Sequence, residues 1–150
     1  KTYGLPGLRL GWIVSRDLGV MRRIRKEREL FNCYVAPPVD FLARLALRHE
    51  GTILNRNSQL VRDNLELATN FFARHDSLFR WRAPMAGVLS FPRWLGLGGT
   101  RVLSQQLLER ESLAFAPSYC FGAGDDHFRL SVSRRSFADG LERLEHFLAT

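Results

Sequence analysis

The chain has 150 residues, of which 45% are hydrophobic and 25% charged, and its net charge is +7. This balance excludes a disordered tail, a collagen-like repeat and a disulfide scaffold. No apolar run approaches the ~20 residues that span a bilayer, and the start of the chain has no signal-peptide pattern. The chain opens on Lys1, directly before a glycine-rich stretch, so we interpret it as part of a longer protein.

The basic residues are almost all arginines. Of the 22 basic residues only Lys1 and Lys26 are lysines, and the one dense cluster lies between Arg22 and Arg28. A surface for nucleic acid is one interpretation of this charge. No nucleic-acid-binding motif accompanies the arginines, and a codon preference for arginine on solvated helix faces accounts for them better. We therefore expect neither nucleic acid nor a membrane as a partner.

Cysteines and histidines indicate no metal site. Cys33 and Cys120 form no metal-ligand spacing, and we expect both to be small buried packing residues. A reduced, cytoplasmic protein is the simplest interpretation, and a single disulfide is the alternative. The four histidines, which also share no metal spacing, are His49, His75, His127 and His146.

Periodicity in the first half predicts one strand followed by helices. Apolar residues alternate over residues 8–14, which is typical of a largely buried strand. Ser15 can cap the helix that follows. Pro37 predicts the start of another helix and Gly51 its end. A longer helical pattern continues to about Arg74.

The second half predicts a compact α+β unit with the order β-β-α-β-β-α. Thr100 and Ser136 are the predicted N-caps of its two helices. The strands are expected at residues 79–82, 87–94, 113–116 and 127–133. We place the domain boundary inside the long helix, dividing the chain into residues 1–65 and 66–150.

The most informative stretch lies at the start of the chain. Lys1 precedes Arg9 by eight residues, across a glycine-rich turn. A neutral lysine amine can form a Schiff base with an aldehyde. The Arg9 guanidinium can hold a phosphate through a two-pronged hydrogen bond. An aldehyde and a phosphate together suit pyridoxal 5′-phosphate (PLP).

These residues resemble the cofactor-lysine motif of fold-type I PLP-dependent aminotransferases of class I/II. That motif consists of a lysine, a short turn containing glycine, and then Gly-x-Arg-x-Gly, which Gly7, Arg9 and Gly11 match. The resemblance implies that Lys1 is the catalytic residue and holds PLP, and that Arg9 binds the cofactor. A surface turn followed by a strand is the alternative interpretation of Lys1 and Arg9.

A second stretch resembles the same family. Phe128 and Leu130 share one face of a predicted strand, whereas Arg129 points to the other face. In the family, the arginine of an Arg-Leu-Ser pattern binds the α-carboxylate of the substrate, and Arg129 matches it. Residues 116–122 resemble the family's Pro-Gly-x-x-Phe-Gly loop, with Ser118 where glycine is usual. The alternative role for Arg129 is a structural salt bridge with the neighbouring aspartates at positions 125 and 126.

The resemblance implies an α/β fold. Residues 1–65 would be the end of the PLP-binding large domain with the inter-domain helix, and residues 66–150 the small C-terminal α+β domain. It also implies an aminotransferase that moves an amino group from an amino acid to a 2-oxo acid and works as a homodimer. The remaining cofactor contacts would lie upstream, so we expect this chain to be inactive alone.

Other functions of the same fold stay open. The same lysine and arginines serve PLP-dependent lyases, cyclases and synthases that act on amino acids. One further alternative is a regulatory PLP domain, which would sense a ligand rather than turn over a substrate. Another is a basic domain that binds nucleic acid. Residues 30–35 contain no arginine for a second carboxylate, which makes an aspartate-type substrate less expected. Tyr3, Tyr34 and Tyr119 could approach the cofactor, although each can also serve in packing.

Overall fold

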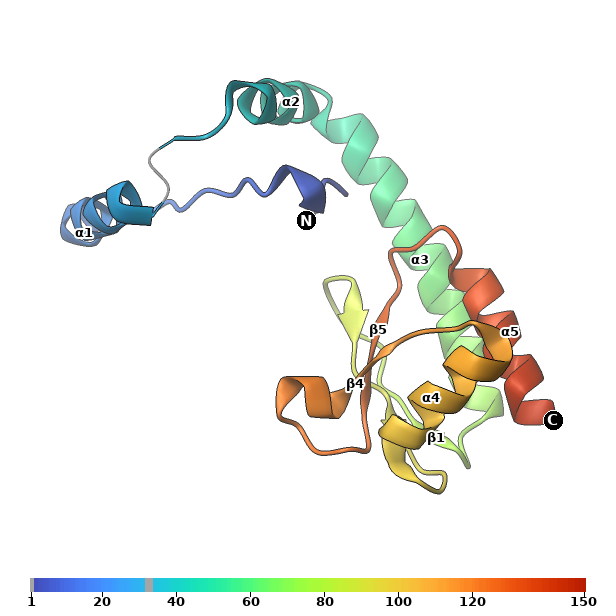
Figure 1. Ribbon diagram of the computed structural model, residues 1–150. Helices are drawn as coiled ribbons and strands as arrows, with labels where there is room; N and C mark the ends of the chain where they lie inside the picture. The colour runs from blue at the N-terminus through green and yellow to red at the C-terminus, as the bar shows by residue number, and fades with distance from the viewer. Residues whose placement is uncertain (1, 32–33) are drawn as a thin grey trace. The chain divides into compact units, whose positions relative to one another are not determined.

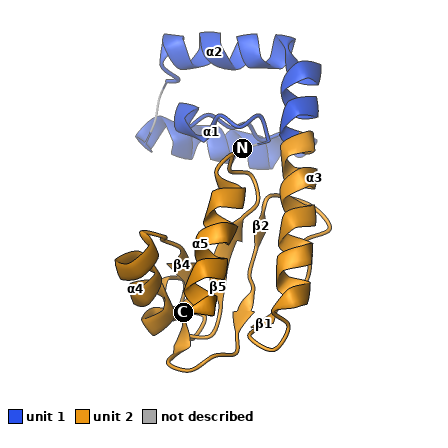
Figure 2. Cartoon of the chain, turned by 90° about the vertical axis from the view of Figure 1, so that its right-hand side faces the viewer, with its two compact units in different colours: residues 1–57 blue, residues 58–150 orange. Residues whose placement is uncertain are grey.

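The computed structural model describes residues 2–31 and 34–150 (Figure 1). The chain divides into two compact units, Lys1–Asn57 and Ser58–Thr150 (Figure 2). Helix α3 (Glu50–Arg74) passes through this division, so its first residues belong to unit 1 and the others to unit 2.

Unit 1 is built from an extended segment and helices. After a short 3-10 helix at Pro6–Leu8, the elements are α1 (Leu18–Phe31), α2 (Pro37–Arg48) and the start of α3. The strand predicted over residues 8–14 is not formed, and Trp12 is 65% exposed. A strand needs hydrogen bonds from a neighbouring strand. The described part of unit 1 contains no strand that could pair with residues 8–14.

Two helix boundaries in unit 1 differ from the prediction. Helix α1 is capped by Asp17 rather than Ser15, because the Val20 amide donates to Asp17 Oδ1 at 3.0 Å. Gly51 does not end a helix, since α2 already ends at Arg48 and Gly51 lies in the first turn of α3. A glycine inside a helix costs about 1 kcal/mol relative to alanine, and the long helix tolerates it.

Unit 2 is an α+β unit as predicted, with the order β-β-β-α-β-β-α, which has one strand more than expected. One two-stranded antiparallel sheet joins β1 (Phe79–Arg80) to β3 (Arg93–Trp94). The other sheet has the order β2-β5-β4, from β2 (Leu89–Ser90), β5 (Phe128–Ser131) and β4 (Ala116–Pro117). The single strand expected over residues 87–94 is divided at Pro92, which has no amide hydrogen to give to a sheet.

The core of unit 2 lies between its helices and sheets. The helices are α3, α4 (Gly99–Glu111) and α5 (Phe137–Ala149). The buried apolar side chains come from all three of these helices, from β1 and β5, and from the residue after β5: Ala68, Phe71, Phe72, Phe79, Leu103, Leu107, Phe128, Val132, Phe137 and Leu144. Burying each of the larger ones stabilises the fold by about 1.5–3 kcal/mol.

The start of α4 is held by a tertiary contact rather than by its own cap. Thr100 does not cap the helix; its hydroxyl donates to Asp125 Oδ1 at 2.9 Å, and the Arg101 amide donates to the same oxygen at 2.8 Å. Ser136 does stand at the N-cap of α5, but its side chain makes no capping hydrogen bond. The expectation of a buried Cys120 is wrong, because this free cysteine is exposed, and Cys33 lies outside the described residues.

Candidate active site

Lys1 lies outside the described residues, so the structure begins at the residue after it. The segment that follows carries Arg9 directly after the 3-10 helix of unit 1. Arg129 lies on β5 of unit 2. The two arginines therefore belong to different units.

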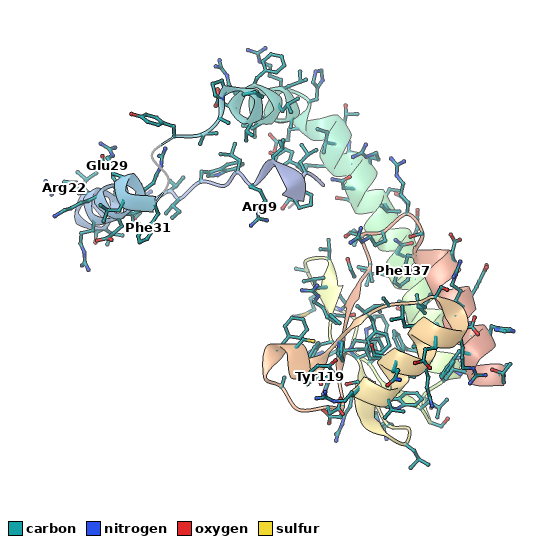
Figure 3. All side chains as sticks on the ribbon, in the orientation of Figure 1. Arg9, Arg22, Glu29, Phe31, Tyr119 and Phe137 are labelled. Atoms are coloured by element: carbon teal, nitrogen blue, oxygen red, sulfur yellow. The ribbon has the colours of Figure 1, made fainter. Side chains whose placement is uncertain are left out.

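Arg9 has an unusual backbone. Its φ is 52° and its ψ 27°, in the left-handed region, and its amide donates to the Pro6 carbonyl to close the 3-10 helix. A non-glycine residue in this region costs about 1–2 kcal/mol. The exposed side chain projects from the segment (Figure 3). Within the described residues no carboxylate pairs with it, so the guanidinium is available for an anion.

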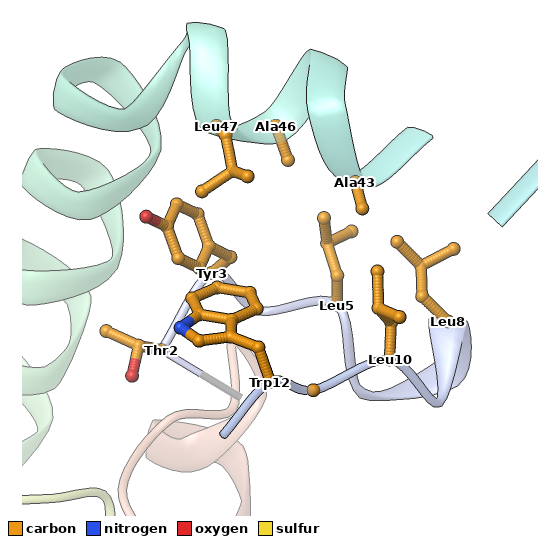
Figure 4. Close-up of a pocket in the computed structure, with 10 residues that line it drawn as sticks. Thr2, Tyr3, Leu5, Leu8, Leu10, Trp12, Ala43, Ala46 and Leu47 are labelled. Carbon is orange, nitrogen blue, oxygen red and sulfur yellow. The ribbon is translucent and has the colours of Figure 1, made fainter. Parts of the chain in front are cut away.

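A cavity of about 250 Å³ lies beside the same segment in unit 1 (Figure 4). Tyr3 and Trp12 line it from the segment, and Ala43 and Leu47 line it from α2. Its lining contains no charged side chain. This cavity therefore does not suit a phosphate, and Arg9 is not among its lining residues.

Arg129 lies in the middle of a strand that buries only its other face. The residue pairs with Ala116 of β4, and Phe128, which precedes it, is 2% exposed. The Arg129 side chain is exposed, as the alternation predicted, and its guanidinium carbon lies 5.2 Å from the centroid of the Phe121 ring. This contact is a cation–π interaction, and it leaves the edges of the guanidinium open to a second group.

The structural salt bridge considered for Arg129 is not formed. Asp125 accepts hydrogen bonds at the start of α4 instead. Asp126 is paired with Arg93, at 2.9 Å, and with the His127 ring nitrogen, at 2.7 Å. The hydrogen bond from His127 is the main cause that lowers the pKa of the Asp126 carboxyl, with Arg93 adding to it against partial burial. Arg129 thus has no carboxylate partner among the described residues.

Ser118 orders the loop that leads to the Arg129 strand. This side chain is fully buried. Its hydroxyl donates to the Gly124 carbonyl at 2.9 Å and accepts from the His127 amide at 3.2 Å. The serine that departs from the family loop pattern therefore ties residues 118–124 to the residue preceding β5.

The remaining candidates from the sequence have other roles in the structure. The Tyr119 ring packs under the guanidinium of Arg101, at 4.0 Å. Tyr34 is 86% exposed. Tyr3 is half-buried, and its burial and the nearby Glu50 carboxylate of α3 raise the pKa of its phenol. Among the described residues, no cluster of His, Cys, Asp or Glu is arranged to hold a metal ion. No helix in the same part of the chain has the length and hydropathy to cross a membrane.

Comparison with known proteins identifies the family. The model of the aminotransferase class I and II family matches residues 1–144. Because this match covers nearly all of the chain, the chain belongs to the aminotransferase class I and II family.

Three relatives illustrate the range within this family. The capreomycidine synthase of Streptomyces vinaceus is 28% identical over 152 residues, covering 100% of this chain and 39% of the relative. The PLP-dependent cyclase OrfR is 30% identical with a TM-score of 0.86, over 99% of this chain and 41% of the cyclase. A PLP-dependent aminotransferase from Streptococcus suis 89-1591 is 28% identical with a TM-score of 0.88, over 99% of this chain and 40% of that aminotransferase.

The chain therefore spans about 40% of the length of the relatives it matches. The TM-scores confirm the fold class predicted from the sequence, an α/β fold of fold-type I, for the part that the chain covers. Transaminating and cyclising enzymes are found at nearly the same identity.

Proposed function

We propose that this chain is the C-terminal part of a PLP-dependent aminotransferase, which moves an amino group from an amino acid to a 2-oxo acid. One structural observation carries the proposal. Arg9 and Arg129 stand at the two motif positions, both are exposed, and neither has a carboxylate partner within the described residues. Free guanidinium groups at these positions suit two anions, a cofactor phosphate and a substrate carboxylate.

The residues of unit 1 fit the cofactor. Arg9 supplies a two-pronged cation for the phosphate. Gly7 and Gly11 leave open space on either side of Arg9, because a Cβ added at each would meet nothing within 4 Å. Lys1, eight residues before Arg9, supplies the amine that would bind the aldehyde of the cofactor. When bound, PLP supplies an electron sink for the bonds at the substrate α-carbon.

The motif positions give each of the chain's own residues a role. Arg129 would hold the α-carboxylate of the amino acid, with the Phe121 ring keeping the guanidinium oriented. The Lys1 amine, once displaced by the amino group of the substrate, would remove the α-proton as a base and return a proton as an acid. Arg9 would keep the cofactor in place while Lys1 is free.

Two substitutions in the intact protein test the proposal. Lys1→Ala should abolish turnover, because no other residue is proposed to move the proton. Arg129→Ala should weaken amino-acid binding about 10- to 100-fold, since charge-assisted hydrogen bonds contribute about 1.5–3 kcal/mol each. Arg129→Lys should restore only part of the affinity, because it lacks the planar fork. Full activity of the Lys1 variant, or unchanged affinity in both Arg129 variants, would refute these roles.

A PLP-dependent cyclase or synthase acting on an amino acid is the second candidate. The similarity to capreomycidine synthase and to the cyclase OrfR, over essentially the whole chain, favours it. Both candidates use the same roles for Lys1, Arg9 and Arg129. Analysis of the products distinguishes them, because only the aminotransferase releases a 2-oxo acid in proportion to the amino acid consumed.

We also propose the setting in which the whole protein works. The composition and the low number of cysteines, two in 150 residues, support a cytoplasmic protein. The resemblance to the family supports a homodimer that acts on small molecules. Sedimentation of the intact protein at several concentrations tests the dimer, and a monomer with full activity would contradict it.

A further inference from the structure

The side chain of Asn57 ties the turn that follows Lys1 to helix α3. Its amide Nδ2 donates to the Thr2 carbonyl oxygen at 2.9 Å, across 55 positions of the sequence. Both residues belong to unit 1, and Asn57 is half-buried. Neither the family motifs nor the proposed function assigns a role to Asn57.

A neighbouring arginine sets the direction of this amide. Arg56 donates to Asn57 Oδ1 twice, from Nε at 3.3 Å and from Nη2 at 3.1 Å. Because the oxygen end of the amide is engaged with a cation, the NH₂ end faces Thr2. The hydrogen bond to Thr2 is therefore made by a pre-oriented donor, and it needs little further ordering of the side chain.

The two residues after Thr2 also contact the start of α3. Gly4 has a φ of +69°, and a Cβ added to it would lie 3.2 Å from Asn57 Nδ2. Partial burial raises the pKa of the Tyr3 phenol, and the neighbouring Glu50 carboxylate adds to this effect. Three consecutive residues, 2–4, are thus held against the first two turns of α3.

We propose that Asn57 is a positioning residue for Lys1, acting through the carbonyl of Thr2. Thr2 follows Lys1 directly in the sequence, so the contact that holds the Thr2 carbonyl acts one peptide bond away from the residue proposed to carry the amine. The inference rests on the proposed function of Lys1. The amine must meet both the cofactor aldehyde and the substrate α-proton, and a displacement of about 1 Å in such a group can cost about 100-fold in rate.

Helix α3 also supplies a matched control. Asn55 lies two residues before Asn57, and its exposed side chain makes no hydrogen bond to a described residue. The variants to compare in the intact protein are Asn57→Ala, Asn57→Asp and Asn55→Ala. The readouts are the rate at which added PLP produces its protein-bound absorbance band, the free energy of unfolding, and kcat and KM for the best amino donor in a panel.

The expected result is a selective loss in the Asn57 variants. Asn57→Ala should slow band formation and lower kcat about 10- to 100-fold. KM should change by less than about threefold, because the carboxylate is held by Arg129. Asn57→Asp keeps the size of the side chain but offers no N–H to the Thr2 carbonyl, so it should lose at least as much. Asn55→Ala should behave like the parent protein.

Two further variants keep the test decisive. If Asn57→Ala does not fold, Arg56→Ala replaces it; freeing the amide should slow band formation about threefold, a loss of about 0.7 kcal/mol. Band formation and kcat in the Asn57 variants within twofold of Asn55→Ala would overturn the inference. Lys1→Ala separates the two proposals. If this variant still gives the parent's absorbance band with PLP, the proposed function fails. If it loses the band while the Asn57 variants behave like the parent, only the role of Asn57 is refuted.

Discussion

Replacing Arg9 by glycine should move stability and cofactor affinity in opposite directions. Arg9 has a φ of 52°, in a region that glycine adopts without strain. Its side chain is free of carboxylate partners in the described part of the chain, so removing it breaks no ion pair there. The backbone conformation therefore determines how substitution changes stability, and the guanidinium determines how it changes binding.

The magnitudes follow from these two terms. Glycine removes a strain of about 1–2 kcal/mol from the left-handed backbone of the folded state. It also increases the entropy of the unfolded chain, which lowers the free energy of unfolding by about 0.4–1 kcal/mol. Alanine keeps the strain. Arg9→Gly should therefore have a free energy of unfolding about 1 kcal/mol higher than Arg9→Ala. Both variants should bind PLP about 10- to 100-fold more weakly than the parent, because both lose a charge-assisted pair with the phosphate.

Urea unfolding without cofactor and titration with PLP measure the two quantities separately. Arg9→Lys keeps the charge without the fork, so its PLP affinity should fall between those of the parent and Arg9→Ala. Equal stabilities of the glycine and alanine variants would show that the strain argument is wrong. Unchanged PLP affinity in all three variants would show that Arg9 does not hold the phosphate.

Three further predictions concern unit 2. Asn64→Leu should lower the free energy of unfolding by about 2–4 kcal/mol, because the buried amide donates to the main-chain carbonyls of Val132 and Arg134, which follow β5, both at 2.8 Å; a loss below 0.5 kcal/mol would contradict this. Ser118→Ala should cost about 1–3 kcal/mol, since two backbone groups lose their partner, and equal stability of variant and parent would show that water replaces the hydroxyl. Burial raises the pKa of Glu145, but hydrogen bonds from Arg74 and His75 outweigh it and lower the pKa below its ordinary value. Glu145 therefore stabilises the fold above its unfolded-state pKa, and this contribution is lost as the pH falls through its folded pKa. Unfolding curves of Glu145→Gln should show a smaller loss of stability on acidification below about pH 4.5, and identical acid limbs would refute the assignment.

Sequence periodicity predicted unit 2 better than unit 1. The helical pattern predicted up to about Arg74 is observed as the end of α3, with Ala68 and Phe72 buried, and the alternation around Arg129 gives the observed faces of β5. These patterns succeed because both sides of the interaction lie within residues 58–150. The prediction of a strand over residues 8–14 was wrong, because a strand must pair with a neighbouring strand and no local pattern specifies that neighbour.

Contacts between distant residues were beyond sequence reasoning. Nothing local to Asn57 indicates that its amide reaches Thr2, and nothing local to Asp125 indicates that it accepts hydrogen bonds at the start of α4. The sequence gives only indirect signals: a glycine at position 4, which leaves room for the Asn57 amide, and Thr100, whose hydroxyl binds Asp125 instead of capping the helix. Ser118 was recognised as a departure from the family loop, but only the structure shows that its hydroxyl bridges that loop to the residue before β5.

The absorbance spectrum of the intact protein with PLP tests the central claim most directly. The account predicts a visible band in the parent protein that Lys1→Ala lacks. Adding the right amino acid should convert this band and release a 2-oxo acid in equal amount. A parent protein that gives no band with PLP, or a Lys1→Ala variant that gives the same band as the parent, would contradict the assignment of Lys1 as the residue that holds the cofactor.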